Sequence, residues 1–494
     1  MNADAALFDV AALRAIEAQA EKSSGDAREL MRRAGQAAWR ELLQHWPQAQ
    51  RLLVVCGPGN NGGDGYELAR HAQQSGRQVR VVRLAVHSPR TEPARHACAD
   101  FAAAGGRIDV FAGDLEPADL VVDALFGLGL SRAPDALATA LIEAINRHPA
   151  PALALDVPSG IDADRGSAPG AAVVATRTLE FLVPKAGLRT GAALDHVGAR
   201  GLATLEVSAS AHGGIACAES LQAEALIRWL RPRARDSHKG THGRVLCVGG
   251  DHGSGGAIVL CAQAAARSGA GWTQVATRAA HVTALLARLP EAMADAIDDG
   301  AALSLRLPRA DVVAIGPGLG QGAWAQDLLA SALAAGKPLV LDADALNLLA
   351  ERGDPLRADT IVTPHPGEAA RLLGISTSGV QDDRFHAAHS LCEHYGCVVV
   401  LKGAGTIIAA PGRTPRVIDA GNPGMAVAGM GDVLTGVIAA LSAQGLPAFD
   451  AASCGALLHA AAGDAAAREG GERGLLPTDL LPWLRRLANP GFMQ

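Results

Sequence analysis

Aromatic residues and clustered positive charge are both scarce in this chain of 494 residues. Phenylalanine, tryptophan and tyrosine together make up 3% of the residues, and the 44 lysines and arginines are outnumbered by 50 aspartates and glutamates, giving a formal net charge of −6. Nucleic-acid-binding surfaces need cations that neutralise phosphates and rings that stack on bases. The composition therefore argues against a nucleic-acid-binding protein and against a surface for anionic membranes.

Long apolar runs and closely paired cysteines are missing as well. No segment approaches the roughly 20 apolar residues that cross a bilayer, and residues 1–10 contain Asp4 and Asp9 but no basic region typical of a signal peptide. The eight cysteines are scattered without a C-x-x-C pair, which favours buried free thiols over disulfides or zinc ligands. We expect a cytoplasmic protein that does not enter a membrane.

Apolar residues are plentiful, at 49% of the chain with 19% charged, which is typical of a folded protein. At roughly 150 residues per domain, the length predicts more than one domain. The apolar spacing predicts helices through residues 10–20 and 30–43, ending at Pro47.

Short apolar runs bounded by glycine or proline then alternate with alanine-rich helical stretches. In the first half they cover residues 51–56, 78–84, 119–125 and 152–157; in the second half residues 244–250, 311–320, 338–346, 360–368 and 397–405. This alternation predicts buried parallel strands with crossover helices, an α/β fold whose ligands bind beyond the carboxyl ends of the strands. Residues 207–220 are small and polar, so we expect two domains, 1–213 and 221–494.

A glycine-rich loop follows the first predicted strand. Gly57, Gly59 and Gly62 fit the pattern G-x-G-x-x-G, which can place a pyrophosphate at a helix N-terminus. The dinucleotide-binding version also requires an acidic residue at the end of the next strand, but that strand ends in Arg83 and Leu84. An ordinary Rossmann dehydrogenase is therefore disfavoured.

Oxygen-bearing side chains lie within this loop and after two further predicted strands. Those within the loop are Asn60, Asn61 and Asp64. Asp123 ends one strand, and Asp156 and Ser159 follow another. If Asn61, Asp123 and Ser159 meet at one edge of the sheet, they form a site for a cation that prefers oxygen ligands. Any one of these residues could instead be a helix N-cap or an Asx-turn, but three such positions favour the shared site.

Three motifs of the first half, GPGNNGGDGYELAR, DALFGLGLSR and LDVPSGIDAD, resemble in this order the YjeF N-terminal domain family, the epimerases of the hydrated nicotinamide nucleotides NADHX and NADPHX. The resemblance implies a Rossmann-like three-layer α/β/α domain and potassium at Asn61, Asp123 and Ser159. It also implies a substrate site formed by Asn60, Asn61, Gly62, Gly63, Asp64, Gly127, Leu128, Gly129, Leu130, Ser131, Arg132, Ala133 and Asp156. The hydrate carries a hydroxyl on C6 beside the ring nitrogen, so its inversion needs an acid/base group, and we predict Asp156 for this role.

The strongest local pattern of the second half is GNPGMAVAGMGDVLTGVIAAL, residues 421–441. Gly429, Met430 and Gly431 can direct backbone amides at a phosphoryl group, where the dipole of the following helix also favours negative charge. Asp432 opens that helix and can take a proton from a hydroxyl during phosphoryl transfer. A plain N-cap is the alternative, but such a cap rarely needs so many glycines. The chain contains no G-x-x-x-x-G-K-[ST] loop, so it is not a P-loop enzyme.

This arrangement resembles the ribokinase-like superfamily and, within it, the ADP- or ATP-dependent NAD(P)HX dehydratases. The five similar segments occur in the family's order at residues 238–257, 314–320, 362–374, 401–406 and 421–432. The resemblance implies a ribokinase-like α/β/α domain whose adenine-nucleotide contacts are Lys402, Gly403, Ala404, Gly405, Thr406 and Gly431. It also implies that the hydrated dinucleotide meets Ala257, Gly318, His365 and Asp432. His365, between two prolines, could equally be a turn residue.

Both resemblances concern one damaged metabolite, so we expect a bifunctional repair enzyme. Its first domain would epimerise the R and S hydrates, and its second would phosphorylate the C6 hydroxyl of the S form with Asp432 as base, after which phosphate leaves. Mg²⁺ is expected on the nucleotide phosphates, ADP is favoured as donor by resemblance to bacterial two-domain members, and a homo-oligomer is expected. A small-molecule kinase fused to a nucleotide-binding regulatory domain is the main alternative, and a dinucleotide-sensing first half is another.

Overall fold

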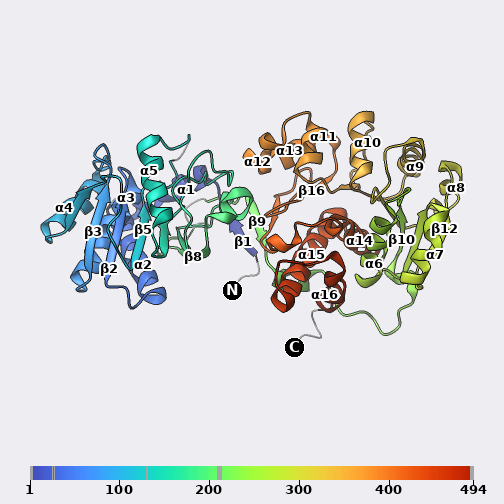
Figure 1. The fold of residues 1–494 in the computed structure, drawn as a ribbon, viewed down its shortest axis with the longest axis horizontal. Coiled ribbons are helices and arrows are strands. Elements are labelled where there is room, and N and C mark those ends of the chain that lie inside the picture. Colours follow the sequence, from blue (N-terminus) through green and yellow to red (C-terminus); the bar gives the residue numbers. More distant parts are fainter. Residues whose placement is uncertain (1–3, 25, 27, 130–131, 209–213, 490–494) are drawn as a thin grey trace. The chain divides into compact units, whose positions relative to one another are not determined.

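The computed structural model describes residues 4–24, 26, 28–129, 132–208 and 214–489. The chain divides into two compact units (Figure 1), Ala6–Ala218 and Glu219–Gln494, the second of which also includes Met1–Ala5. Over the described part of the chain, no helix combines the length and the apolar character needed to cross a bilayer.

A parallel sheet forms the centre of the first unit. Its described strands lie in the order β4-β3-β2-β5-β6-β7-β8. Their bounds are β2 Arg51–Cys56, β3 Gln78–Arg83, β4 Arg107–Val110, β5 Leu120–Ala124, β6 Ala152–Leu155, β7 Arg177–Phe181 and β8 Ala199–Ala203. The helices are α1 Val10–Ser24, α2 Glu29–His45, α3 Asn60–Gln74, α4 Glu92–Ala103 and α5 Ala136–Arg147.

Alternate residues of β2 show why this unit has three layers. Leu52 joins an apolar cluster with residues of α1, α2, α3 and α4, whereas Leu53 joins a second cluster with residues of α5. Successive side chains of a strand point to opposite faces, so a strand that is apolar at both positions is covered on both sides. The predicted α/β/α fold is confirmed for this unit, and the predicted strands at 51–56, 78–84, 119–125 and 152–157 correspond to β2, β3, β5 and β6.

The second unit contains a larger sheet. Its described strands follow the order β1-β9-β18-β17-β16-β15-β14-β13-β10-β11-β12. Their bounds are β1 Asp4–Leu7, β9 Ala218–Leu221, β10 Arg244–Val248, β11 Trp272–Thr277, β12 Met293–Ala296, β13 Val312–Ile315, β14 Leu339–Leu341, β15 Ile361–Val362, β16 Val398–Leu401, β17 Ile407–Ala409 and β18 Arg416–Ile418. The run from β16 to β12 is parallel, and β17 is antiparallel to both of its neighbours.

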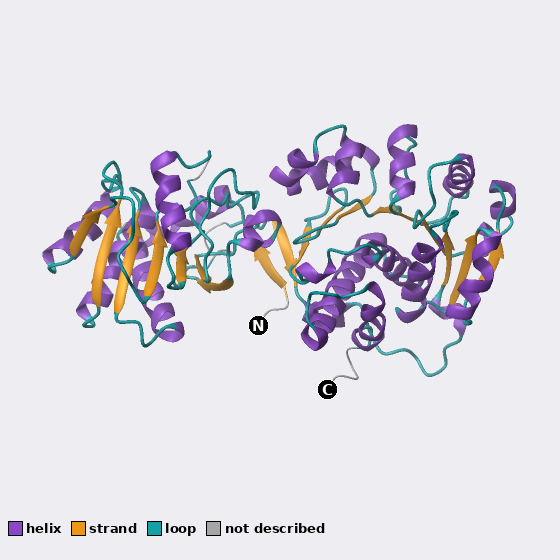
Figure 2. Ribbon diagram, viewed as in Figure 1, coloured by secondary structure: helices purple, strands orange, loops and turns teal. Residues whose placement is uncertain are grey.

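Helices cover both faces of this second sheet (Figure 2). The helices of the unit are α6 Gly255–Arg267, α7 Ala279–Arg288, α8 Gly300–Ser304, α9 Ala323–Ala334, α10 Asp344–Arg352, α11 Pro366–Leu373, α12 Thr377–Asp382, α13 Arg384–Tyr395, α14 Met430–Ala443, α15 Ala448–Gly470 and α16 Leu480–Leu487. Residues of α6, α14, α15 and α16 share one apolar cluster with inward-facing residues of β10, β13 and β16. The nearly all-apolar α14 lies at the centre of this layer.

Each sheet has a point where the strand order reverses. In the first unit the chain goes from β2 outward to β3 and β4 and returns to place β5 on the other side of β2. In the second unit it goes from β10 to β11 and β12 and returns with β13 on the other side of β10. The loops that follow the two central strands diverge at such a point and leave a crevice for a ligand. The glycine-rich segments found in the sequence follow these strands.

Candidate active sites

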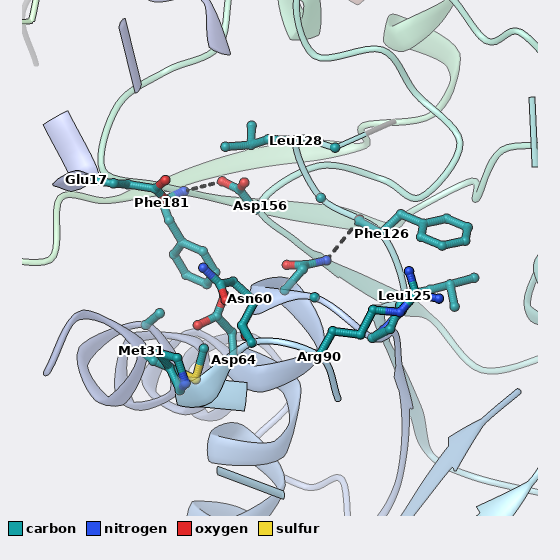
Figure 3. A pocket seen from close by; sticks show the side chains of 18 of the residues that line it. Glu17, Met31, Asn60, Asp64, Arg90, Leu125, Phe126, Leu128, Asp156 and Phe181 are labelled. Atoms are coloured by element: carbon teal, nitrogen blue, oxygen red, sulfur yellow. Dashed lines mark hydrogen bonds between the residues drawn. The ribbon is translucent and has the colours of Figure 1, made fainter. Parts of the chain in front are cut away.

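A cavity of about 810 Å³ opens at the reversal point of the first unit (Figure 3). It is lined by the loops that follow β2 and β5, by α1, and by the residues that follow β6. The predicted site residues among its lining are Asn60, Asn61, Asp64, Gly127, Leu128, Gly129, Arg132, Ala133 and Asp156. Leu130 and Ser131 lie outside the described residues. The size suits a ligand as large as a nucleotide.

Two of the predicted residues, Gly62 and Gly63, do not line this cavity. A Cβ on Gly62 would collide with the carbonyl oxygen of Gly57, and one on Gly63 would collide with the side chain of Met31. These glycines allow α3 to pack closely. Gly59, which precedes α3, forms no side-chain cap, so the first amides of the helix are open to an anion.

Asn61, Asp123 and Ser159 lie close together, joined by the backbone of Phe126. Ser159 Oγ donates to Asp123 Oδ1 at 2.6 Å and accepts from the amide of Phe126 at 2.7 Å. The side-chain amide of Asn61 donates to the carbonyl of Phe126 at 2.9 Å (Figure 3). Asn61 Oδ1 is buried and has no partner among the described residues. Burial raises the pKa of Asp123 to about 6, despite its hydrogen bonds from Ser159.

The carboxylate of Asp156 is held in one orientation at the cavity wall. Its Oδ1 forms an ion pair with Lys185 Nζ and accepts from the amide of Phe181 at 3.1 Å (Figure 3). Lys185 is fully buried and also donates to the carbonyl of Phe181 at 2.8 Å. Asp156 has φ +64°, a left-handed conformation that non-glycine residues rarely adopt and that recurs at functional sites.

Further acidic groups stand near Asp156. Glu17, on α1, lines the cavity, and burial together with the charge of Asp156 raises its pKa to about 7. Burial, followed by the charges of Asp156 and Glu17, raises the pKa of Asp64 well above its usual range. Sequence analysis missed Glu17 and Lys185, since neither belongs to a motif; Glu17 is one polar position of an amphipathic helix.

The cavity wall also carries two arginines among its apolar residues. Arg90 and Arg132 line it, and Figure 3 shows Arg90 across the cavity from Glu17 and Asp156. Two further lining residues, His87 and Thr91, have buried side-chain atoms, Nδ1 and Oγ1, without a partner among the described residues. This end can therefore take an anionic group.

Predicted residues also lie together along the carboxyl edge of the sheet of the second unit. Gly318, in the loop after β13, has φ +59°, and a Cβ built on it would lie 3.1 Å from Cβ of Ala257 at the start of α6. A Cβ on Gly431, at the start of α14, would lie 3.2 Å from Lys402 Nζ, at the end of β16. The loops that carry the predicted nucleotide and hydrate contacts thus lie at the same edge of the sheet.

His365 is the N-cap of α11. Its Nδ1 accepts from the amides of Gly367 and Glu368 at 2.9 and 3.3 Å, and Glu368 accepts in return from the amide of His365 at 2.7 Å. This reciprocal pair is a capping box. The side chain of His365 is still 57% exposed, so it can reach a ligand while it caps the helix.

Asp432 lies in the first turn of α14. Gly429, with φ +93°, precedes this helix and provides no side-chain cap, which leaves the first amides to a ligand. Burial, and then the charge of Asp342, raise the pKa of Asp432 to about 7, while Lys402 opposes the shift. A carboxyl group that ionises near neutrality is suited to accept a proton.

Asp342 connects α14 to the ends of three strands. It is buried at the end of β14 and accepts from Lys402 Nζ at 2.6 Å and from the hydroxyls of Thr363 and Thr435, both at 2.8 Å. These partners come from the ends of β16 and β15 and from α14. Lys402 therefore directs its ammonium at Asp342, with Glu368 at 3.7 Å, and its side chain is only 17% exposed. The sequence did not single out Asp342, whose role depends on segments distant along the chain.

The loop from Lys402 to Thr406 turns between β16 and β17. Gly403 has φ +129°, and Thr406 donates to its carbonyl at 3.0 Å, which closes a tight turn. Ala404 and Gly405 lie at its tip. Of the residues that the structure describes, no three histidine, cysteine or carboxylate side chains are arranged to hold a metal ion.

Comparison with known proteins agrees with this two-part arrangement. The family described as YjeF-related protein N-terminus matches residues 27–187, and the family described as NAD(P)H-hydrate dehydratase matches residues 245–486. The bifunctional NAD(P)H-hydrate repair enzyme Nnr of Escherichia coli K12 is 45% identical over 465 residues, covering 94% of this chain and 90% of the relative. The chain belongs to the bifunctional NAD(P)H-hydrate repair enzyme family. The predicted family is thereby confirmed.

Other members of the family are similar over the same extent. The enzyme of this name from Coxiella burnetii is 46% identical, covering 98% of this chain and 99% of the relative. A ribokinase-like superfamily protein from Enterococcus faecalis V583 superposes with a TM-score of 0.52 at 33% identity, covering 55% of this chain and 95% of that structure. The predicted ribokinase-like fold of the second unit is confirmed by this likeness.

Proposed function

We propose that this protein repairs hydrated NADH and NADPH in two steps, epimerisation of the R and S hydrates followed by nucleotide-dependent dehydration of the S hydrate. One observation carries the proposal: the motifs of both units lie in loops along the carboxyl edges of the two sheets, in a chain that aligns with repair enzymes over nearly its whole length. The first unit would perform the epimerisation and the second the dehydration.

Asp156 would serve the epimerisation as an acid/base group. The hydroxyl on C6 of the hydrate is adjacent to the ring nitrogen, whose lone pair assists its departure. Lys185 and the amide of Phe181 fix the carboxylate at the cavity wall, so proton exchange needs little reorganisation. The amides at the start of α3, with Asn60 and the loop from Gly127 to Ala133, would hold the nucleotide.

Asn61, Asp123 and Ser159 would hold potassium, because the buried Oδ1 of Asn61 lacks a partner and lies in a cluster of oxygen atoms. Bound there, the ion would supply a positive charge beside the loop that follows β5. Ser159 and Asn61 themselves already fix this loop through their hydrogen bonds to Phe126.

In the second unit, Asp432 would take the proton of the C6 hydroxyl as that oxygen accepts a phosphoryl group. The open amides at the start of α14 would stabilise the charge of the transferred group. The ring nitrogen then expels phosphate to give a C6 iminium, and loss of a proton from C5 to solvent forms the C5=C6 double bond and restores the dihydropyridine. Lys402–Thr406 and Gly431 would contact the adenine nucleotide, with ADP favoured as donor; Ala257, Gly318 and His365 would contact the hydrate.

Mg²⁺ would be held mainly by the nucleotide phosphates, since the described residues include no metal-binding cluster of histidine, cysteine and carboxylate side chains. When bound, Mg²⁺ neutralises phosphate charge. We also propose that the protein forms a homo-oligomer, as expected from its alanine-rich helices.

The test is recovery of the near-ultraviolet absorbance of the reduced nicotinamide ring. Purified protein and Mg²⁺ are added to a mixture of R and S hydrates with ADP, with ATP or without nucleotide. Full, nucleotide-dependent recovery supports both steps and identifies the donor. Recovery of the S fraction alone, after correction for spontaneous epimerisation, contradicts the first step. No recovery with any nucleotide favours a kinase whose product keeps the phosphate.

A further inference from the structure

The cavity of the first unit has two chemically different ends. Glu17, Asp64 and Asp156 interact electrostatically at one part of the wall, whereas Arg90 lies across the cavity from Glu17 and Asp156 (Figure 3). Arg132 also lines the cavity. A hydrated dinucleotide is similarly uneven, with anionic phosphates at its centre and a neutral hydrated ring at one end. Coulomb attraction directs the phosphates to the arginines, which leaves the acidic side for the neutral ring. The reacting carbon then lies near more than one carboxyl group.

We propose that Glu17 is a second catalytic residue of the epimerisation, the general acid that works with Asp156. This inference rests on the epimerase activity proposed above.

The position of Glu17 supports this role. Leu13, Glu17 and Glu21 all line the cavity, and their spacing of four residues places them on one face of α1. Among the described residues Glu17 has no hydrogen-bond or ion-pair partner, whereas Asp156 is bound by Lys185 and Phe181. Glu17 is therefore a half-buried carboxyl group that is free to act on a ligand.

Burial and neighbouring charges keep a fraction of the Glu17 side chains protonated near neutral pH. Burial has the largest effect and Asp156 the next, so that the pKa of Glu17 rises to about 7. Lys185 and, on its own helix, Arg14 oppose this shift, while Glu21 adds to it. Asp64, on α3, is coupled to Glu17 as well, and its own pKa is raised.

The reaction then balances with one proton donor and one acceptor. Neutral Glu17 gives its proton to the C6 hydroxyl, the bond between C6 and oxygen breaks, and water leaves as the ring nitrogen forms a double bond to C6. Water adds to the other face of C6 and gives a proton to Asp156. Solvent returns that proton from Asp156 to Glu17, so no co-reactant is consumed.

The test compares Glu17→Gln with Glu143→Gln. Glu143 lies on α5, is 56% exposed and does not line the cavity, so its variant should match the wild type. Interconversion of purified R and S hydrates is followed by chromatography without nucleotide, and the spontaneous rate is subtracted. Glu17→Gln should lower kcat by about 10² to 10⁴-fold with little change in KM. The fall in wild-type rate as pH rises through about 7 should disappear.

Glu17→Asp gives a second measurement because it keeps a carboxyl group and should retain a descending limb of the pH profile. Either an unchanged kcat and pH profile in Glu17→Gln or a rise in KM alone would overturn the inference. If Glu17→Gln does not fold, loss of the descending limb in folded Glu17→Asp overturns it. A wild-type protein that does not exceed the spontaneous rate refutes the epimerase proposal instead.

Discussion

A carboxyl group that ionises near neutrality makes the proposed dehydration sensitive to pH. Burial and the charge of Asp342 raise the pKa of Asp432 to about 7, and a base works only when it is ionised. The rate of dehydration of the S hydrate should therefore increase as pH rises through about 7. The measurement is the initial rate with saturating nucleotide across neutrality. A flat profile would contradict the role of Asp432 as base.

Ser159 links Asp123 to the backbone of Phe126 at the proposed potassium site. Replacing its side chain should therefore lower the free energy of unfolding. Ser159→Ala leaves the amide of Phe126 without its 2.7 Å partner, at a cost of about 1 to 3 kcal/mol. Chemical denaturation measures this loss. Replacing potassium by a bulky organic cation should lower the melting temperature of the wild type but not that of Ser159→Ala. Ser23→Ala, on the exposed side of α1, is the control.

At the scale of an element, two glycines at the start of α3 have different roles: Gly62 allows close packing, whereas Gly59 leaves room for a ligand. Gly62→Ala should destabilise the first unit by about 1 to 3 kcal/mol, because its Cβ meets the carbonyl of Gly57. Gly59 has φ −97°, which alanine adopts without strain, and a Cβ built there has no atom within 4 Å. The melting temperature of Gly59→Ala should therefore equal that of the wild type. The substitution should nevertheless raise KM for the hydrate, because Gly59 lines the cavity and a methyl group there would narrow the approach to the open amides of α3. An unchanged KM would place the phosphate elsewhere.

Strands and loops were predictable from the sequence to different degrees. Central strands such as β2 and β13 are buried on both faces, so an apolar run identifies them. The edge strand β4 is half exposed and charged, and no apolar run marks it. Glycine motifs correctly marked the loops that follow β2, β5, β10 and β13, but the strand order that brings these loops together was not predicted. Glu17, Lys185 and Asp342 were not predictable, because their importance comes from charges that approach only in the folded chain.

At the scale of the whole molecule, each candidate site is built from one unit alone. The cavity residues lie within Ala6–Ala218, and the residues around Asp432 within Glu219–Gln494. Asp432→Asn should therefore abolish dehydration and leave epimerisation intact. Asp156→Asn should still dehydrate the S hydrate but recover the R fraction only at the spontaneous rate. Equal loss of both activities in a folded variant would contradict this separation.

The first strand has a consequence for any attempt to divide the gene. β1, whose residues Asp4 and Ala5 belong to the second unit, is the edge strand beside β9. A fragment that starts at Glu219 would lack this strand and expose the backbone donors and acceptors of β9. Such a bare edge invites pairing with another copy. A soluble dehydratase fragment would thus need its missing strand supplied, for example by a circular permutation that moves the first residues to the other terminus.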